Sequence, residues 1–400
     1  MLRAVLTDDV LGAVRALLVL ELVAALRAAG RMLRTSGGRP LDAAQPGSPA
    51  GAAPHTAPGP IAAVVPVLDE EGRLGPALDA LSACGPELVE IVVVDGGSSD
   101  GTRQLARAAA ARDPRIRLVE APPVPPGWNG KAWNLNVGLL TVAAPWLATI
   151  DADVRVGPTV LAAAVERAER DGLAALSVAT RQRVADAGSA LLHPAMLTTL
   201  VYRFGLPNVV VSSPAEVQAN GQLFVARRDA LVAADAFRAA RASRCEDVTA
   251  ARALAAHGAR IGFFEGDAVV RMYDSWRECA RNWPRSLALH DAFTSPARTW
   301  LGLLEALFAQ ALPLPTLLFV LALRHHIWFA HEAIAIAGAL VAMRLGVLGG
   351  TRRAYVDPPF WYWLSPLADL PALALIVAAL LRRRHVWRGR TLVGEPGTPA

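Results

Sequence analysis

Between residues 61 and 170, short apolar runs alternate with segments of helical periodicity. Four runs rich in Val, Ile and Leu have the length of strands and are bounded by turn residues; they lie at 61–68, 90–95, 115–120 and 146–151. Segments with a helical pattern follow each of them, at 73–83, 101–111, 132–143 and 159–170. Strands that alternate with helices at this spacing predict a parallel sheet covered by helices. The predicted fold class is therefore α/β.

Acidic residues stand at the ends of three of these predicted strands. Asp69 and Glu70 follow the first, Asp95 closes the second, and Asp151 closes the fourth with Asp153 just beyond it. Sheets of this kind bind their ligands beyond the carboxyl ends of the strands. We therefore expect the three groups of acids to converge on one edge of the sheet.

Three long apolar runs follow residue 295, at 300–323, 327–343 and 360–381. Each approaches the ~20 residues that a helix needs to cross a bilayer. Arginines stand between them, so they predict membrane helices rather than the buried core of a soluble protein. We prefer an α/β domain on the cytoplasmic side. Three C-terminal spans would then place the basic residues 382–390 outside, against the positive-inside tendency, so the number of spans stays open.

The N-terminal part of the chain has a different pattern of apolar and charged residues. Residues 10–29 are apolar but are interrupted by Arg15, Glu21 and Arg27, which fits either a membrane helix or an interfacial helix. No clear cleavage site for a secretory signal follows. The texture changes predict an N-terminal apolar helix (1–34), a flexible linker rich in Pro, Gly, Ser and Ala (35–60), the α/β domain (61–295), a transmembrane helical region (296–385) and a basic, polar tail (386–400).

Composition excludes several classes of protein. Hydrophobic residues make up 53% and charged residues 19% of the chain, and the net charge is +5. A charged share below the ~25% of soluble domains argues against a disordered protein. The positive excess is small for the length and clustered beside apolar runs, so nucleic acid is not an expected partner. Three cysteines without zinc spacing provide no disulfide framework.

Two motifs carry candidate chemistry. VVVDGGSSDGT (92–102) places a carboxylate before a Gly/Ser-rich turn that opens a helix, and such a turn offers backbone N–H groups to an anion or ribose. TIDADV (149–154) places Asp151 and Asp153 on the same side of an extended segment. Hard oxygen ligands at this spacing suit Mg²⁺ or Mn²⁺, which take substrate phosphates as further ligands. Each motif alone also fits an ordinary loop at a strand end.

The motifs taken together resemble those of family 2 glycosyltransferases. Over residues 61–290 the order is PVLDEE (66–71), VVVDGGSSDGT, GKAWNLNVG (130–138), DAD, QANGQLFVARRDAL (218–231), CEDV (245–248) and RNWPR (281–285). The resemblance implies a GT-A fold with a Rossmann-like mixed sheet, a nucleotide-sugar donor and inversion at the anomeric carbon. The C-terminal apolar runs and VWRGR (386–390) are similar to the membrane-bound bacterial subgroup with hopene-associated and carotenoid-type glycosyltransferases.

The same resemblance implies a set of residues that bind the nucleotide. Pro66, Asp69 and Glu70 match the motif beside the base and ribose. Asp95 matches the carboxylate that contacts the base, and Asp100 lies in the same loop. These five residues are therefore expected around the nucleoside.

The resemblance also implies a metal site and a general base. Asp153 is expected to be the direct ligand of Mg²⁺ or Mn²⁺, with Asp151 supporting the ion or holding the ribose. Lys131 is expected to approach the diphosphate. The pair Glu246–Asp247 matches the acidic pair of the family, in which the aspartate accepts the proton of the acceptor hydroxyl.

RNWPR is similar to the family signature that lines the diphosphate and acceptor channel. It points to Arg281 and Trp283 as site residues. The pattern departs from the family's at its end, because Trp283 precedes Arg285 with Pro284 between them.

The predicted function is an inverting glycosyltransferase that moves a sugar from a nucleotide-sugar donor, expected to be a UDP-sugar, to a hydroxyl of a lipid-like acceptor. It would act as a multi-pass protein of the inner cell membrane. The alternatives are a catalytically silent nucleotide-binding scaffold subunit, which the intact Asp95, Asp153 and Asp247 argue against, and a polysaccharide synthase, which the altered RNWPR argues against. The sugar and the acceptor stay open.

Overall fold

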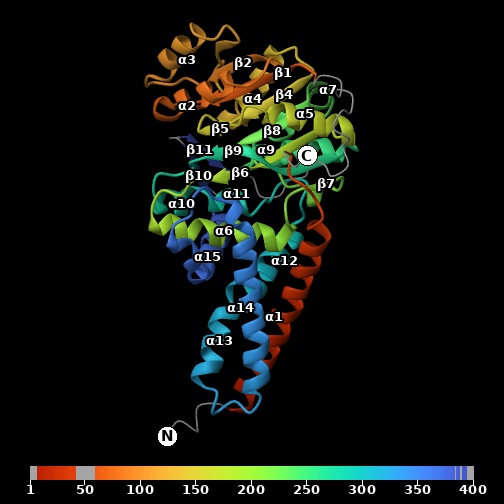
Figure 1. Ribbon diagram of the computed structural model, residues 1–400, viewed down its shortest axis with the longest axis vertical. Coiled ribbons are helices and arrows are strands. Elements are labelled where there is room, and N and C mark those ends of the chain that lie inside the picture. The colour runs from red at the N-terminus through yellow and green to blue at the C-terminus, as the bar shows by residue number, and fades with distance from the viewer. Residues whose placement is uncertain (1–6, 42–58, 383, 388–389, 394–400) are drawn as a thin grey trace, which may run out of the picture.

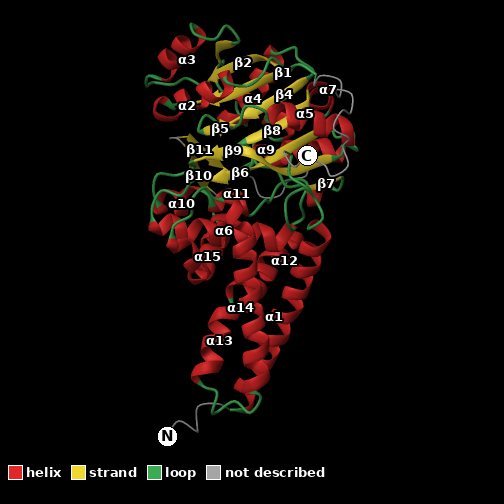
Figure 2. Cartoon of the chain, in the orientation of Figure 1, coloured by secondary structure: helices red, strands yellow, loops and turns green. Residues whose placement is uncertain are grey.

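A nine-stranded sheet forms the centre of the α/β domain (Figures 1 and 2). The computed structural model describes residues 7–41, 59–382, 384–387 and 390–393. The strand order is β3 (Ile116–Glu120), β2 (Leu88–Asp95), β1 (Ile61–Val67), β4 (Trp146–Ile150), β8 (Leu223–Arg227), β6 (Ala175–Gln182), β9 (Ile261–Val270) and β5 (Val154–Val156), with β7 (Val209–Val211) also paired to β9.

The first half of the sheet is parallel and the second half is mixed. Strands β3, β2, β1 and β4 run in one direction, as the alternation of runs and helices predicts. Strand β8 is antiparallel to both β4 and β6, and β6 is parallel to β9. The parallel sheet expected from periodicity therefore ends at β4, and the whole is the mixed sheet implied by the GT-A resemblance.

Strand β1 is buried on both faces, which explains its continuous apolar sequence. Its odd-numbered residues, such as Val65, pack in one cluster with α2 (Glu71–Ser82), α3 (Thr102–Ala110) and α5 (Val160–Asp171). Its even-numbered residues, such as Val64, pack in another with α4 (Gly130–Thr141), α7 (Arg228–Ala233), α8 (Ala236–Ala239) and α9 (Glu246–Ala256). Two helical layers thus fix the sheet and its carboxyl edge.

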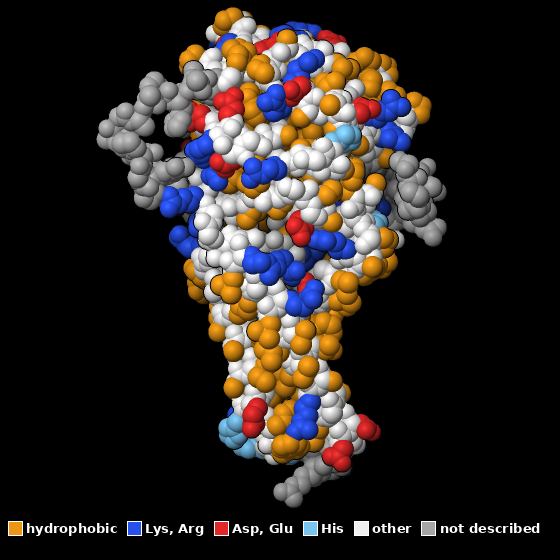
Figure 3. Space-filling model, turned by 90° about the vertical axis from the view of Figure 1, so that its right-hand side faces the viewer, with side chains coloured by type: hydrophobic (Ala, Val, Ile, Leu, Met, Phe, Trp, Pro, Cys, Tyr) orange, Lys and Arg blue, Asp and Glu red, His pale blue; other side chains and the backbone are white. Residues whose placement is uncertain are grey.

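A stalk of helices extends from the α/β domain (Figure 1). It contains α1 (Asp8–Thr35), α13 (Pro313–Ala322) and α14 (Ala330–Thr351). The chain enters α13 through α12 (Pro296–Ala306) and a π-helical turn, η3 (Leu307–Ala311). Pro313 breaks the helix after this turn because it lacks a backbone N–H. Apolar side chains cover much of the face of the stalk that Figure 3 shows.

Further helices, which we call the neck, lie between the stalk and the sheet (Figure 1). They are α6 (Ala187–Phe204), α10 (Trp276–Asn282), α11 (Pro284–Leu287), the 3₁₀ segment η5 (Phe360–Ala368) and α15 (Asp369–Leu381). Their shared core includes Met196, Trp283 and Ile376. The neck therefore joins segments that are far apart along the chain.

In the part of the chain that the structure describes, two helical segments are long and apolar enough to cross a membrane, Ala330–Ala354 and Phe360–Leu381. The bent pair Pro296–Ala311 and Pro313–Ala322 is a third if it is counted as one span. The predicted run 360–381 is a helical segment, but it packs on α6 in the neck rather than along the stalk (Figure 1).

Smaller elements complete the described chain. They are the 3₁₀ turns η2 (Pro214–Glu216) and η4 (Arg352–Ala354), and an antiparallel pair of β10 (Arg384–Trp387) and β11 (Arg390–Val393). Most of the predicted linker 35–60 and part of the predicted tail 386–400 lie outside the described residues.

Candidate active site

A cavity of about 770 Å³ lies at the carboxyl edge of the sheet and continues toward the neck. Eight of the predicted site residues line it: Pro66, Glu70, Lys131, Asp151, Asp153, Glu246, Asp247 and Trp283. Four do not: Asp69, Asp95, Asp100 and Arg281. The predicted convergence of acids on one edge is thus observed for the groups after β1 and β4, together with the acidic pair that opens α9.

The predicted nucleotide loops are joined to each other by side chains. Asp69, whose backbone has φ of 53°, accepts hydrogen bonds from the backbone N–H and hydroxyl of Ser99, at 2.7 and 3.2 Å. Asp100 accepts from the backbone N–H groups of Glu71 and Thr102, at 3.1 and 3.0 Å. These two acids therefore hold the loop after β1 against the loop after β2.

Asp95 is buried at the end of β2 and organises its own turn. Its carboxylate accepts from the hydroxyl and backbone N–H of Ser98, from the N–H of Gly97 at 3.2 Å and from Nε of Arg103 at 2.6 Å. Burial alone would raise the pKa of Asp95, but the bonds from Ser98 and Arg103 outweigh it and the pKa lies below its usual value. The carboxylate is therefore ionised and fully engaged by its loop.

Lys131 links the metal motif to the acidic pair of α9. Its Nζ lies 2.7 Å from Oδ1 of Asp151 and 2.8 Å from Oε1 of Glu246. Burial would lower the pKa of Lys131, but Asp151, Glu246 and Asp247 raise it well above the usual value. The lysine is charged and fixes two elements, β4 and α9, that enter the cavity from different parts of the chain.

Asp153 differs from the other acids of the cavity. Within the described ranges its carboxylate makes no hydrogen bond or ion pair closer than 4 Å, whereas Asp151 pairs with Lys131. Burial, followed by the nearby charges of Asp151 and Glu70, raises the pKa of Asp153 to about 7. A half-buried carboxylate that lies beside other carboxylates and lacks a direct cationic partner fits a divalent cation.

The donor set is incomplete without a substrate. Among the residues that the structure describes, no three His, Cys, Asp or Glu side chains are grouped to hold a metal. Asp151 and Asp153 supply two carboxylates, and Mg²⁺ is commonly bound by one or two carboxylates with phosphate oxygens and waters. The residues present therefore fit an ion that binds together with a diphosphate.

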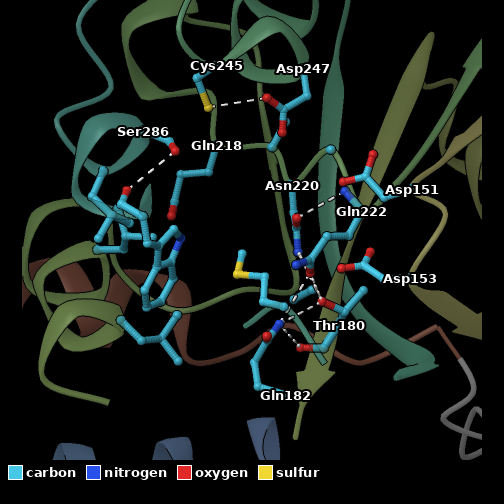
Figure 4. Close-up of a pocket in the computed structure, with 18 of the residues that line it drawn as sticks. Asp151, Asp153, Thr180, Gln182, Gln218, Asn220, Gln222, Cys245, Asp247 and Ser286 are labelled. Carbon is cyan, nitrogen blue, oxygen red and sulfur yellow. Dashed lines mark hydrogen bonds between the residues drawn. The ribbon is translucent and has the colours of Figure 1, made fainter. Parts of the chain in front are cut away.

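Asp247 lies at the start of α9 and faces the cavity (Figure 4). The thiol of Cys245 donates a hydrogen bond to its Oδ1 over 3.2 Å. Burial and the charge of Glu246 raise the pKa of Asp247 to about 6, with Lys131 acting in the opposite direction. A carboxylate whose pKa lies near neutrality is suited to accept a proton.

Of the residues in RNWPR, Asn282, Trp283 and Arg285 line the cavity, whereas Arg281 is exposed on α10 outside it. Pro284 explains the difference, because it starts a new helix, α11, and changes which residue faces inward. The ring of Trp283 stacks on that of His193 at 3.9 Å between centroids. Arg285 was not singled out by the sequence motif and is the better placed arginine.

Neutral polar residues that sequence reasoning gave no role also line the cavity. They are Thr180 and Gln182 at the end of β6, and Gln218, Asn220 and Gln222 before β8 (Figure 4). The alternation of polar side chains in QANGQ, directly before an apolar strand, is the signal that could have identified the last three.

The lining of the cavity extends to the neck and to α14. There it includes Leu197, Leu200 and Val201 of α6, Leu289, and residues 350–351 at the end of α14. One cavity thus joins an acidic edge of the sheet to helices that continue into the stalk.

Comparisons with known proteins show what the α/β domain is similar to. Residues 62–219 match the family described as Glycosyl transferase family 2. The lipopolysaccharide core biosynthesis glycosyltransferase LpsC of Rhizobium meliloti is 35% identical over 97 residues, which are 24% of this chain and 33% of that protein. The succinoglycan biosynthesis protein ExoA of the same organism is 33% identical over 90 residues, 22% of this chain and 26% of that protein. The matched region thus spans about a third or less of these relatives.

A solved structure shares the fold over most of the chain. The mannosyltransferase PcManGT from Pyrobaculum calidifontis, solved in complex with GDP-Man and Mn²⁺, superposes with a TM-score of 0.52 at 20% identity, covering 93% of this chain and 97% of that chain. The α/β domain therefore has the GT-A fold.

Proposed function

We propose that this chain, whose residues 62–219 form a family 2 glycosyltransferase domain, is an inverting glycosyltransferase. It would move a sugar from a nucleotide-sugar donor to a hydroxyl of a lipid-like acceptor. The single observation that carries the proposal is the continuous cavity, which joins Asp151, Asp153 and Asp247 to the apolar side chains of α6. An amphiphilic acceptor can place its hydroxyl beside Asp247 while its chain contacts the neck.

The donor site is proposed to need a divalent cation held by Asp153 and Asp151. Such an ion, Mg²⁺ or Mn²⁺, stabilises the negative charge that grows on the leaving nucleoside diphosphate. The solved mannosyltransferase of the same fold holds GDP-Man with Mn²⁺, which supports this pairing of nucleotide and metal. Lys131 keeps Asp151 in position and Arg285 adds positive charge to the cavity wall.

Asp247 is proposed to be the general base. Glu246 is engaged by Lys131 at 2.8 Å, whereas the Asp247 carboxylate accepts a hydrogen bond from the thiol of Cys245 and has no direct ion pair within the described residues. The acceptor oxygen attacks the anomeric carbon from the face opposite the diphosphate, its bond to that carbon forms as the carbon–phosphate-oxygen bond breaks, and its proton goes to Asp247. This single displacement inverts the anomeric centre and needs no enzymic nucleophile.

The stalk is proposed to anchor the protein in a membrane, with the α/β domain on the cytoplasmic side. Figure 3 shows Lys and Arg side chains gathered where the apolar stalk meets the α/β domain. Helix α1 carries Arg27, Arg31 and Arg34 at the end nearest that domain. An excess of basic residues on this side supports the orientation. The inner bacterial membrane and a UDP-sugar donor belong to the same proposal.

The proposal is tested with the full chain in lipid nanodiscs. Release of nucleoside diphosphate is measured from UDP-glucose, UDP-N-acetylglucosamine and GDP-mannose, with Mn²⁺ or Mg²⁺ and a bacterial lipid extract. We expect turnover that depends on metal and lipid, and a loss of at least about 10²-fold in D247N and in D153A. The exposed D79N is the matched control.

Two results would count against the proposal. Wild-type turnover in D153A and D247N would show that Asp153 is not needed for the metal and that Asp247 is not the general base. Nucleotide binding without transfer to any lipid fraction would favour the alternative of a silent scaffold subunit, and a long glycan product would favour a polysaccharide synthase.

A further inference from the structure

Five neutral polar residues form a group in the cavity wall that the proposed chemistry does not use. We call Thr180, Gln182, Gln218, Asn220 and Gln222 the amide cluster. Its three glutamines are buried to nine-tenths or more, with exposed fractions of 7%, 9% and 3% for Gln182, Gln218 and Gln222. An amide atom of these residues that has no partner in the protein can donate to or accept from a ligand in the cavity.

Hydrogen bonds to the amide oxygen hold the side chain of Gln222 in place. Oε1 accepts hydrogen bonds from the hydroxyl of Thr180, from Nδ2 of Asn220 at 2.9 Å and from Nε2 of Gln182 at 3.2 Å. This fixes the amide plane and leaves the two N–H groups of its Nε2 without a hydrogen bond to any residue of the described chain. A pre-oriented donor in the cavity wall is thereby available to a ligand.

Gln218 is available in a different way. Neither its amide oxygen nor its amide nitrogen makes a hydrogen bond within the described ranges, although the residue is only 9% exposed. Gln218 lines the cavity, and in the view of Figure 4 Asn220 and Gln222 stand between it and the carboxylates of Asp151 and Asp153, with its side chain extending away from them. Together with Gln222, it presents donors and an acceptor without adding net charge.

The order of strands explains which part of a ligand meets this cluster. Along the edge, β2 and β1 carry the predicted nucleotide loops, β4 carries the metal carboxylates, and β8 and β6 carry the amide cluster. The backbone carbonyl of Gln222 accepts from the N–H of Asp151, so the cluster directly adjoins the metal motif. Neighbouring strands are ~4.8 Å apart, so β6 lies ~10 Å beyond β4. A nucleoside diphosphate sugar has the same linear order of base, diphosphate and sugar.

We propose that the amide cluster binds the hydroxyl groups of the transferred sugar, and that Gln218 and Gln222 determine which sugar is accepted. The inference rests on the proposed function. It concerns the transferred sugar, whose identity the proposed function leaves open. Uncharged amides match an uncharged, hydroxyl-rich ring, whereas the diphosphate is served by the cation site next to them. Asp247 lies beside the same segment, because a Cβ on Gly221 would stand 2.8 Å from its Oδ2.

The experiment compares the affinity for a nucleotide sugar with that for its nucleoside diphosphate. Isothermal titration uses the full chain in nanodiscs with Mn²⁺, and the probes are UDP-glucose, UDP-N-acetylglucosamine, GDP-mannose, UDP and GDP. Q218M removes the amide without breaking a protein hydrogen bond. Q222E keeps the accepting oxygen and replaces the N–H groups. The ratio of the two affinities cancels any effect of the new charge on the shared diphosphate, and Q104M on the exposed face of α3 is the control.

We expect the ratio for the preferred nucleotide sugar to fall about 10-fold in Q218M and in Q222E, and to stay within about twofold in Q104M. Nucleoside diphosphate affinity stays within about twofold in Q218M. Ratios unchanged in both variants overturn the inference and leave the proposed function standing. A rise in the acceptor KM alone would also overturn the inference, because it would assign the amide cluster to binding a sugar of the acceptor. If the wild-type protein binds no nucleotide at all, the proposed function fails and this inference fails with it.

Discussion

The thiol of Cys245 donates a hydrogen bond to Oδ1 of Asp247 over 3.2 Å, and both residues line the cavity. The thiol lowers the pKa of Asp247, while burial and Glu246 raise it, and the balance places it at about 6. Because a base must be deprotonated to act, turnover should fall as the pH drops through about 6.

Replacing Cys245 by alanine should move this acidic limb to higher pH. The variant removes a hydrogen bond that favours the charged carboxylate, so the pKa of Asp247 rises, by roughly half a pH unit for a weak donor. The measurement is kcat/KM between pH 5 and 8. C84A, in the core of the sheet, is the control and should leave the midpoint unchanged. A lower rate with an unmoved midpoint in C245A would show a purely structural role for the thiol.

Gly221→Ala should lower turnover while the protein stays folded. A Cβ at this position would lie 2.8 Å from Oδ2 of Asp247, so the carboxylate must move. A displacement of this size at a base costs on the order of 10-fold or more in rate. Thermal unfolding and kcat are measured together, with G75A as a matched control, since no atom lies within 4 Å of a Cβ there. Wild-type kcat in G221A would contradict the assignment of the base.

Acidification should destabilise the protein through His193. The ring is buried against Trp283, its Nδ1 lies 2.8 Å from the hydroxyl of Tyr355, and burial lowers its pKa to about 3. The unfolded chain takes up a proton near pH 6.5, whereas the folded chain does not. This contribution to stability is therefore nearly complete above about pH 7.5 and decreases as the pH falls through about 6.5, by about 1.4 kcal/mol at pH 5.5.

The check on His193 is a comparison of unfolding free energies at pH 7.5 and 5.5 in wild type and H193N. Other groups titrate in both proteins, so the difference between the two pH dependences isolates the histidine. Parallel curves would mean that the ring is not kept neutral in the folded state.

Asp369→Asn should destabilise the junction of α14 and α15 strongly. Asp369 pairs with Arg344 at 2.8 Å with both side chains buried, and its other oxygen accepts from Gln310 at 2.8 Å. Removing one partner leaves a buried charge, which costs about 3–5 kcal/mol. The exposed pair of Arg227 and Asp229 provides the control, because D229N should cost about 0–1 kcal/mol. Equal changes in thermal midpoint for the two variants would refute this difference.

The parallel half of the sheet could be predicted because the pattern that identifies each strand lies in consecutive residues of the sequence. Strand β1 is apolar at nearly every position since both of its faces are covered, and acids such as Asp151 follow the strand ends directly. Strands β8, β6 and β9 could not be ordered in this way. Their pairing is set by packing between segments that are far apart in the sequence, as in the contact of Leu176 with Val225.

The sequence motifs predicted some of the residues that share the cavity. They could not predict the residues whose position depends on packing in the folded chain. Asp153 and Asp247 reach the same cavity, as expected of their motifs. Arg281 is outside it and Arg285 inside, because Pro284 restarts the helix. The carboxylate of Asp95 accepts hydrogen bonds from Ser98 and Arg103. These contacts form only in the folded turn, so the sequence alone does not reveal them. A motif gives the residue type, while the fold decides which atoms remain for a ligand.

The cavity wall has the two-part chemistry of an alkyl glycoside, because it includes both the polar amides and leucines of α6. Surfactants such as maltosides should therefore compete during purification with the donor sugar through their sugar heads and with the acceptor through their hydrocarbon tails. Activity recovered on exchange into a zwitterionic surfactant would reveal this competition directly.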